Sequence, residues 1–405
     1  MKNIIISVKS IERKFQLTLA LALTCSLLLA QNGSQLNGVL NSIETNNTTL
    51  TALRKAAEAQ KLENKTDIFL PNPEVGLNYL WSDPSSIGSR TDVSVVQSFD
   101  IPTIAGMKKQ MANEQNNLIE WQYKANRMNI LLEANQYCID LIYNNALKKE
   151  LELRMEHAET IADGYKTRLA QGDANILEYN KVQLNLYTIQ GEISQIEVER
   201  NALLSQLKRM NGGIDVAFDD FRYNLSPLPE NFDEWVAQAS QRNPALAYLE
   251  QEIEVGKKQV SINKAMGLPT FSAGYMSEKV VGQQYQGVAM GVSIPIWENK
   301  NRVKQAKASV IASEALYADN RQQIYSQLQI LYDRAAGLKT IAANYRSALV
   351  NINNADLLKK ALDMGEISLL EYIVEIGLYY NSINLALEAE RDYQKAFAEL
   401  SAVEL

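Results

Sequence analysis

Residues that could carry out chemistry are few in this chain and do not cluster. Among its 405 residues are one histidine, His157, in a charged helical stretch, and two cysteines, Cys25 and Cys138. The sequence contains no G-x-S-x-G, Walker A or H-E-x-x-H motif, and one histidine leaves little scope for general acid–base catalysis. We therefore expect no enzyme, no cofactor and no metal site. His157 is predicted to be solvated, and Cys138 to be a small apolar residue on a helix face.

The polar residues that do recur form two copies of one helix-turn pattern. Segments 171–179 and 364–372 each carry a glycine, a capping residue three positions later and a glutamate after three more. Glycine can take the left-handed conformation that ends a helix, and Ser or Asn followed by Glu forms the capping box of the next one. The residues are Gly172, Asn175 and Glu178 in the first copy, and Gly365, Ser368 and Glu371 in the second. Each segment is predicted to join two long antiparallel helices.

The two copies indicate an internal duplication. Gly172 and Gly365 are 193 positions apart, and Ile101-Pro102 matches Ile294-Pro295 at the same offset. The predicted repeats are 31–224 and 225–405, each made of a helix, a β-hairpin and a long helical pair. Both prolines are expected at helix starts, where proline is tolerated. No further proline precedes Gly172, so the first long helix is predicted to extend ~100 Å, which suits a coiled coil or a helical tube.

Two hairpins interrupt the helical pattern, at 74–99 and 270–294, where the apolar period changes from 3.6 to 2. Their expected loops are 82–90 and 278–285. We expect one strand face to meet lipid, through Val75, Leu77, Tyr79, Phe271, Tyr275, Val288, Met290 and Val292. Four strands close no membrane barrel and form no large sandwich core, since the smallest membrane barrels have about eight strands. The strands are therefore predicted to be shared between chains, and three copies would give twelve.

The N-terminus reads as a secretory signal peptide over residues 1–30, with a basic start and an apolar run from Leu17 to Ala30. A lipoprotein anchored through Cys25 is the alternative, although Ala22-Leu23-Thr24 is a poor lipobox. Without these residues the chain has 36 basic and 46 acidic side chains, a net charge of −10, which repels nucleic acid. A helix is expected from Leu36 to about Lys65.

With these elements in order, the chain resembles the TolC family of outer-membrane efflux ducts. The resemblance is carried by Asn243-Pro244-Ala245-Leu246, by the strand that ends in 292–297, and by the two Gly-plus-Leu-Glu-Tyr turns. It implies a mainly α fold with β: a long coiled-coil α-helical barrel continuous with a transmembrane β-barrel of twelve strands in a homotrimer. In the first half, 46–50 lacks the proline found at Pro244, which puts that helix start in doubt.

The resemblance also implies a gate at the periplasmic mouth. Glu371 occupies the position of an acidic ring that constricts the family's pore, and a second ring would need Glu375, because Val374 stands at the family's second acidic position. Glu178 and Asp173 are the matching candidates in the first repeat. The competing interpretation is structural: Glu371 and Glu178 complete capping boxes, and the turn acids are solvated.

By this resemblance the function is an outer-membrane channel of a Gram-negative bacterium, in a tripartite efflux or type I secretion system. Its partners would be a periplasmic adaptor, an inner-membrane pump that supplies the energy, and outer-membrane lipid. The alternative from another class is a secreted or periplasmic coiled-coil structural protein without channel activity. A diffusion porin is a third possibility, but porin chains are mostly strand and this chain is mostly helical in pattern.

Overall fold

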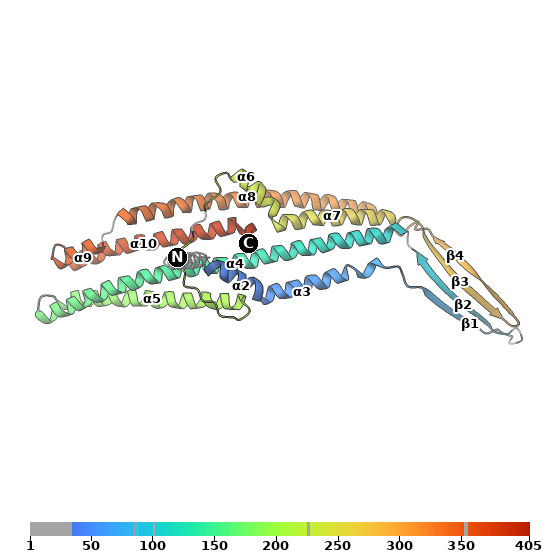
Figure 1. Ribbon diagram of the computed structural model, residues 1–405, viewed down its shortest axis with the longest axis horizontal. Coiled ribbons are helices and arrows are strands. Elements are labelled where there is room, and N and C mark those ends of the chain that lie inside the picture. The colour runs from blue at the N-terminus through green and yellow to red at the C-terminus, as the bar shows by residue number, and fades with distance from the viewer. Residues whose placement is uncertain (1–34, 85, 87, 100–101, 225–226, 352–354) are drawn as a thin grey trace, which may run out of the picture. The chain divides into compact units, whose positions relative to one another are not determined.

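The computed structural model describes residues 35–84, 86, 88–99, 102–224, 227–351 and 355–405 (Figure 1). Contacts divide the chain into two compact units, and each unit takes segments from both halves of the sequence. The first unit comprises the residues up to Thr48, Ile130–Leu228 and Leu331–Leu405; the second comprises Thr49–Asn129 and Pro229–Ile330. The predicted signal peptide, 1–30, and Cys25 lie outside the described residues. The predicted repeat boundaries stay a prediction.

The second unit holds a four-stranded antiparallel sheet in the order β1-β2-β3-β4, seen as four adjacent arrows in Figure 1. The strands are β1 Glu74–Leu80, β2 Arg90–Phe99, β3 Thr270–Val280 and β4 Gln283–Ser293. Its helical elements are α3 Thr48–Glu63, η1 Thr66–Ile68, α6 Phe232–Arg242, α7 Pro244–Ala265, and the starts of α4 (Pro102–Gln171) and α8 (Arg302–Asn351). Polar contacts join these helices: Lys61 pairs with Glu120, and Gln251 Nε2 donates to Glu114 Oε2 at 2.8 Å.

The first unit is helical. Besides the later parts of α4 and α8 it contains α2 Gln35–Asn46, α5 Ile176–Met210, α9 Ala355–Asp363, α10 Leu369–Leu400 and η3 Ala402–Glu404. Its largest core packs α2 and α5 on α4 around the connector residue Phe218, which is 1% exposed. Four residues of α4 at helical spacing are buried in this core: Leu131, Ala134, Cys138 and Leu141.

The first predicted helix is broken in two at Asn47. Although residue 48 is a threonine and not a proline, α3 begins there, just as α7 begins at Pro244. The buried Asn47 side chain explains the break, because its Nδ2 donates to Met210 O at 2.7 Å and fixes the chain against the end of α5. In the second half, Asn243 Oδ1 caps α7 by accepting from Ala245 N at 2.9 Å. The helix start that lacks the proline is therefore present, and it follows an asparagine as α7 does.

Two sequence predictions are wrong near the second hairpin. The loop expected over 278–285 is mostly strand, since only residues 281 and 282 separate β3 from β4, with Gly282 at a φ of +76°. Pro295 starts no helix, whereas Pro102 is the first residue of α4. The chain stays irregular until Asn301, whose φ of +67° is tolerated by asparagine, and Gln305 N then donates to Asn301 O at 2.8 Å as α8 begins.

Candidate functional site

The register of the sheet sorts its side chains onto two faces. Val75 lies opposite Val95, Val95 opposite Tyr275, and Tyr275 opposite Val288. Directly opposed residues share a face, and alternate residues along each strand return to it. The eight residues predicted to face lipid therefore lie on one face, which we call the apolar face. Val93, Val95 and Phe99 join them there.

These apolar side chains are uncovered within the chain. Met290 is 86% exposed, Val288 79% and Val75 74%. A soluble protein rarely leaves so continuous an apolar surface open to water, so the face is built to be covered. Gln97 also lies on this face, and its Nε2 is satisfied by two backbone carbonyls, Pro71 O and Ser98 O, both at 2.8 Å. Its amide therefore does not break the apolar character of the face.

The opposite face carries mostly small or polar residues, and we call it the small-residue face. Four of its residues are Ser272, Gly274, Gly291 and Ser293. Close approach requires glycine at two of these positions, because a Cβ at Gly291 would lie 2.5 Å from Ser272 Oγ, and one at Gly274 would lie 2.5 Å from Val95 O. A sheet that curls toward this face crowds it in this way.

Three charged residues of the small-residue face lie toward the hairpin ends, while Glu74 lies at the other end of β1. Arg90 Nε lies 2.8 Å from Asp92 Oδ1 and 3.2 Å from Glu278 Oε1, so one guanidinium bridges two carboxylates on neighbouring strands. The group carries a net charge of −1. Exposed ion pairs of this kind contribute little to stability. Their effect is to place negative charge at one end of this face.

The two glycine turns have the same geometry. Gly172 and Gly365 adopt φ values of +83° and +72°. After each glycine the next amide donates back into the helix: Asp173 N to Arg168 O at 2.8 Å, and Glu366 N to Ala361 O at 2.9 Å. Both hydrogen bonds close a Schellman motif, which satisfies carbonyls left free at the helix end.

Both turns continue into complete capping boxes. Asn175 Oδ1 accepts from Glu178 N at 3.0 Å, and Glu178 Oε2 accepts from Asn175 N at 2.9 Å. Ser368 Oγ accepts from Glu371 N at 3.3 Å, and Glu371 Oε2 accepts from Ser368 N at 2.8 Å. These hydrogen bonds from Ser368 hold the pKa of the exposed Glu371 carboxyl below its usual range.

The two turns lie together in the first unit. One apolar cluster joins the ends of α4 and α5 to α9 and α10. Its buried members are Ala162, Tyr165, Val182, Leu362, Leu369, Tyr372 and Ile376. Around it the acids expected at a gate stay at the surface: Asp173, Glu371 and Glu375 are exposed and Glu178 is half-buried. Among the described residues of one chain, these four carboxylates are not grouped closely enough to bind a metal ion.

Sequence reasoning missed one buried charge. Arg154 is only 4% exposed, and its guanidinium donates to Asn384 Oδ1 at 2.8 Å and to Tyr380 O at 3.2 Å. His157 was predicted to be solvated, and this is wrong: it is half-buried, with Nδ1 3.4 Å from the Tyr380 hydroxyl oxygen. The burial of Arg154 could have been inferred from the sequence, because Leu151, Arg154 and Ala158 share one buried stripe at helical spacing.

Cys138 behaves as the apolar residue that the sequence predicted. Its side chain is fully buried in the core of the first unit, and burial raises the pKa of the thiol to about 12. A thiol with so high a pKa is protonated at neutral pH and is neither a nucleophile nor a metal ligand.

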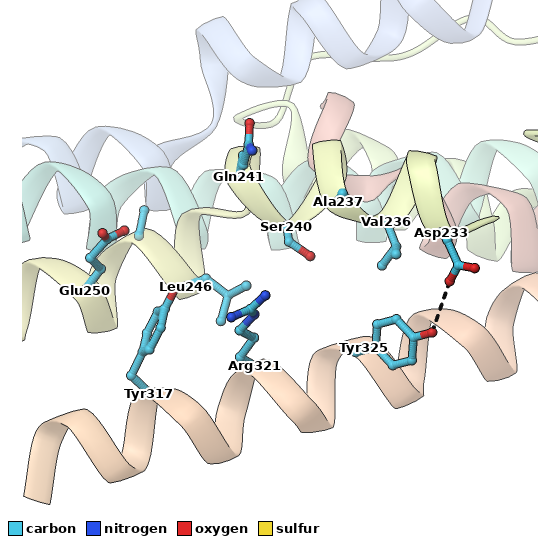
Figure 2. Close-up of a pocket in the computed structure, with 11 residues that line it drawn as sticks. Asp233, Val236, Ala237, Ser240, Gln241, Leu246, Glu250, Tyr317, Arg321 and Tyr325 are labelled. Atoms are coloured by element: carbon cyan, nitrogen blue, oxygen red, sulfur yellow. Dashed lines mark hydrogen bonds between the residues drawn. The ribbon is translucent and has the colours of Figure 1, made fainter. Parts of the chain in front are cut away.

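A cavity of about 570 Å³ lies in the second unit between α6, α7 and α8. Figure 2 shows Tyr317, Arg321 and Tyr325 rising from α8 toward the two shorter helices. Asp233 and Glu250 stand at opposite ends of the cavity, and Tyr325 donates to Asp233 Oδ1 at 3.3 Å (Figure 2). Carboxylates separated in this way form no acid–base pair, and the lining contains no histidine or cysteine.

None of the described helices is both long and apolar enough to span a membrane.

This architecture defines a class of fold. A small antiparallel sheet with one exposed apolar face, joined to long helical pairs that turn at capped glycines, is the fold of solved outer-membrane channels, and the resemblance to the TolC family is confirmed at the level of the fold. The chain is similar to a membrane protein from Pseudomonas aeruginosa, with a TM-score of 0.73 and 16% identity over 92% of each chain. It is also similar to the Campylobacter jejuni CmeC outer membrane channel, with a TM-score of 0.72 and 14% identity over 91% of this chain and 85% of CmeC.

Sequence comparison adds one curated relative. The alkaline protease secretion protein AprF of Pseudomonas aeruginosa is 22% identical over 284 residues, which are 64% of this chain. The match spans 58% of AprF, less than two thirds of its length. No protein-family model matches the chain. The proteins that this chain is similar to are channel and secretion proteins and not enzymes.

Proposed function

We propose that this chain is one subunit of an outer-membrane duct of a Gram-negative bacterium. The duct passively conducts substrates from an inner-membrane pump through the periplasm and the outer membrane. The observation that carries the proposal is the two-faced sheet, with exposed apolar side chains on one face and glycines and serines on the other. Lipid covers the first face and the pore lies along the second.

The outline of the apolar face supports a membrane position. On β1 its side chains run from Val75 toward the hairpin end, whereas on β4 they run from Val288 toward the helices. Val75 and Val288 lie in the same row, meaning the line of directly opposed residues that crosses the four strands. The centre of the apolar band therefore shifts by about four residues between β1 and β4, across three strand spacings. At ~3.4 Å per residue and ~4.8 Å per spacing, strands crossing a flat lipid layer would tilt by roughly 40°. Strands of membrane barrels tilt by about 35–45°.

Three chains close the barrel. β1 and β4 are the outer strands of the sheet, so each presents a row of backbone N–H and C=O groups to the next chain. In lipid such edges must be paired, because each unsatisfied group costs several kcal/mol. Three copies supply twelve strands, with β1 of one chain beside β4 of its neighbour. The helices of the three chains continue the pore as a tube into the periplasm.

The paired turns form the periplasmic end of the duct, where an adaptor protein joins it to the pump. Glu371 is the carboxylate that we place in the constriction, with Glu375, Glu178 and Asp173 near it. Three converging copies attract cations and repel one another. In the single chain Asp173, Glu371 and Glu375 are exposed, so these three carboxylates are free to line a shared opening. The cap and the constriction are compatible roles for Glu371, because its carboxylate accepts from Ser368 and stays at the surface.

The competing function is a coiled-coil structural protein without a channel. Two measurements on the purified protein separate the functions. A duct is extracted from membranes only by detergent, and gives discrete conductance steps in a planar lipid bilayer. A protein recovered without detergent that leaves the bilayer insulating would overturn the proposal.

A further inference from the structure

The apolar face ends in a polar ledge before it reaches the hairpin turn. On β3 and β4 the rows beyond Tyr275 and Val288 are occupied by four polar residues. These are Ser277, Lys279, Gln284 and Gln286, and we call them the ledge. The register places Ser277 opposite Gln286 and Lys279 opposite Gln284, on the same face as the apolar band. The ledge is therefore the part of the outer surface just beyond the apolar band.

Hydrogen bonds fix part of the ledge and leave other groups available. The Tyr275 hydroxyl donates to Gln286 Oε1 at 2.7 Å, and Gln284 Nε2 donates to Ser277 Oγ at 3.3 Å. The tyrosine thus joins the last apolar row to the first polar one. The Gln286 amide nitrogen and the Gln284 amide oxygen are not used in these two bonds. Lys279, Gln284 and Gln286 are exposed.

Near the hairpin ends, the two faces of the sheet carry different charges. Lys279 is the one charged side chain on the apolar face of the described strands, while the acids Asp92 and Glu278 lie on the small-residue face. Among the described strand residues no acid shares the outer face with Lys279, whereas Arg90 pairs with the two inner acids. An outer surface with a cation and no acid is complementary to negatively charged surroundings.

We propose that the ledge binds the headgroup of a phosphorylated glycolipid in the outer leaflet. Lys279 Nζ would meet a phosphate oxygen, and the Gln284, Gln286 and Ser277 side chains would exchange hydrogen bonds with sugar hydroxyls. A phospholipid headgroup carries one phosphate and few hydroxyls, so it would engage fewer of the three uncharged polar side chains than a sugar does. Amides and hydroxyls both donate and accept, as sugar hydroxyls do. The inference rests on the proposed function, since it needs the apolar face in lipid.

Native mass spectrometry of the full-length protein in mild detergent tests this inference. The probe is an acylated glucosamine disaccharide with two phosphates, and the comparison lipid is phosphatidylglycerol. Lys279→Gln with Gln286→Leu should lower the retained glycolipid at least fivefold, and Lys279→Gln alone should lower it less. Gln283→Leu, on the opposite face of the same hairpin, should retain as much as the wild type. Retention of phosphatidylglycerol should change less than twofold in every variant.

Equal glycolipid retention by the wild type and the double variant would overturn the proposal that the ledge binds the glycolipid. A parallel loss of both lipids would also overturn it, because that result would leave Lys279 as a general anion contact. Conductance of the same samples keeps the two proposals apart. The double variant should conduct as the wild type does, because loss of the ledge leaves the duct intact. A wild-type protein that does not conduct would instead contradict the proposed function.

Discussion

Replacing Met290 by arginine tests the orientation of the sheet. Met290 is 86% exposed, lies opposite Ala273 and sits between Val288 and Val292 on the apolar face. If this face meets lipid, an arginine near the bilayer midplane should cost ~2–4 kcal/mol per chain. That cost is a factor of about 30 to 900 in the folding equilibrium of each chain, and three chains share one barrel. If the face met water, the same change would cost almost nothing, since an exposed surface position tolerates arginine within about 0.5 kcal/mol.

The matched control is Ala289→Arg, one residue away on the small-residue face, opposite Gly274. It is a better control than Gly291, where any Cβ would approach Ser272 Oγ. Denaturant unfolding of the protein in lipid vesicles gives the free energies. Met290→Arg should lower the unfolding free energy by ~2–4 kcal/mol, while Ala289→Arg should mainly change conductance. Equal losses for the two variants, or no loss for Met290→Arg, would refute the assignment of the faces.

Further predictions concern the turns and the glycine packing. Ser368→Ala should lower stability by ~1 kcal/mol in thermal unfolding, by removing the cap of α10. Glu371→Gln keeps a hydrogen-bond acceptor at the cap, so it should cost less stability than Ser368→Ala, but it should weaken block by multivalent cations in single-channel recordings; unchanged block would leave Glu371 as a cap alone. The folded pKa of Glu371 is lowered, so its stabilisation is present above its unfolded pKa of about 4.3 and is lost as pH falls through the folded value. The protection factors of amides at the start of α10, corrected for the intrinsic pH dependence of exchange, should therefore fall in acid, and Glu371→Gln should abolish that fall. Gly291→Ala should cost ~1 kcal/mol through its contact with Ser272, and Ser272→Gly should restore most of it.

Local patterns in the sequence predicted much of the fold. Alternation placed the apolar and small residues of β3 and β4 on opposite faces, because the two-residue period of a strand leaves no other arrangement. The turns at Gly172 and Gly365 could be placed to the residue, since a left-handed glycine followed by a capping box is a short-range signal.

What the sequence could not predict depended on contacts between distant segments. The helix break at Asn47 is held by a hydrogen bond to Met210, which no local window contains. His157 on α4 is half-buried beside Tyr380 on α10, whereas its charged neighbours in the sequence suggested a solvated side chain. Pro295 was expected to start a helix because proline is tolerated there, but an irregular stretch follows it and α8 begins only after Asn301.

Cross-linking between chains at the sheet edges tests the shared barrel most directly. In a Cys138→Ala background, one cysteine replaces Leu77 on β1 and a second replaces Val288, Met290 or Val292 on β4, and the intact cells are oxidised. The shared barrel predicts that at least one of the three pairings gives covalent dimers and trimers and no larger species, while each single-cysteine variant stays monomeric on denaturing gels. Uncross-linked chains for all three pairings, or a ladder that continues beyond three chains, would contradict closure of the barrel by three copies.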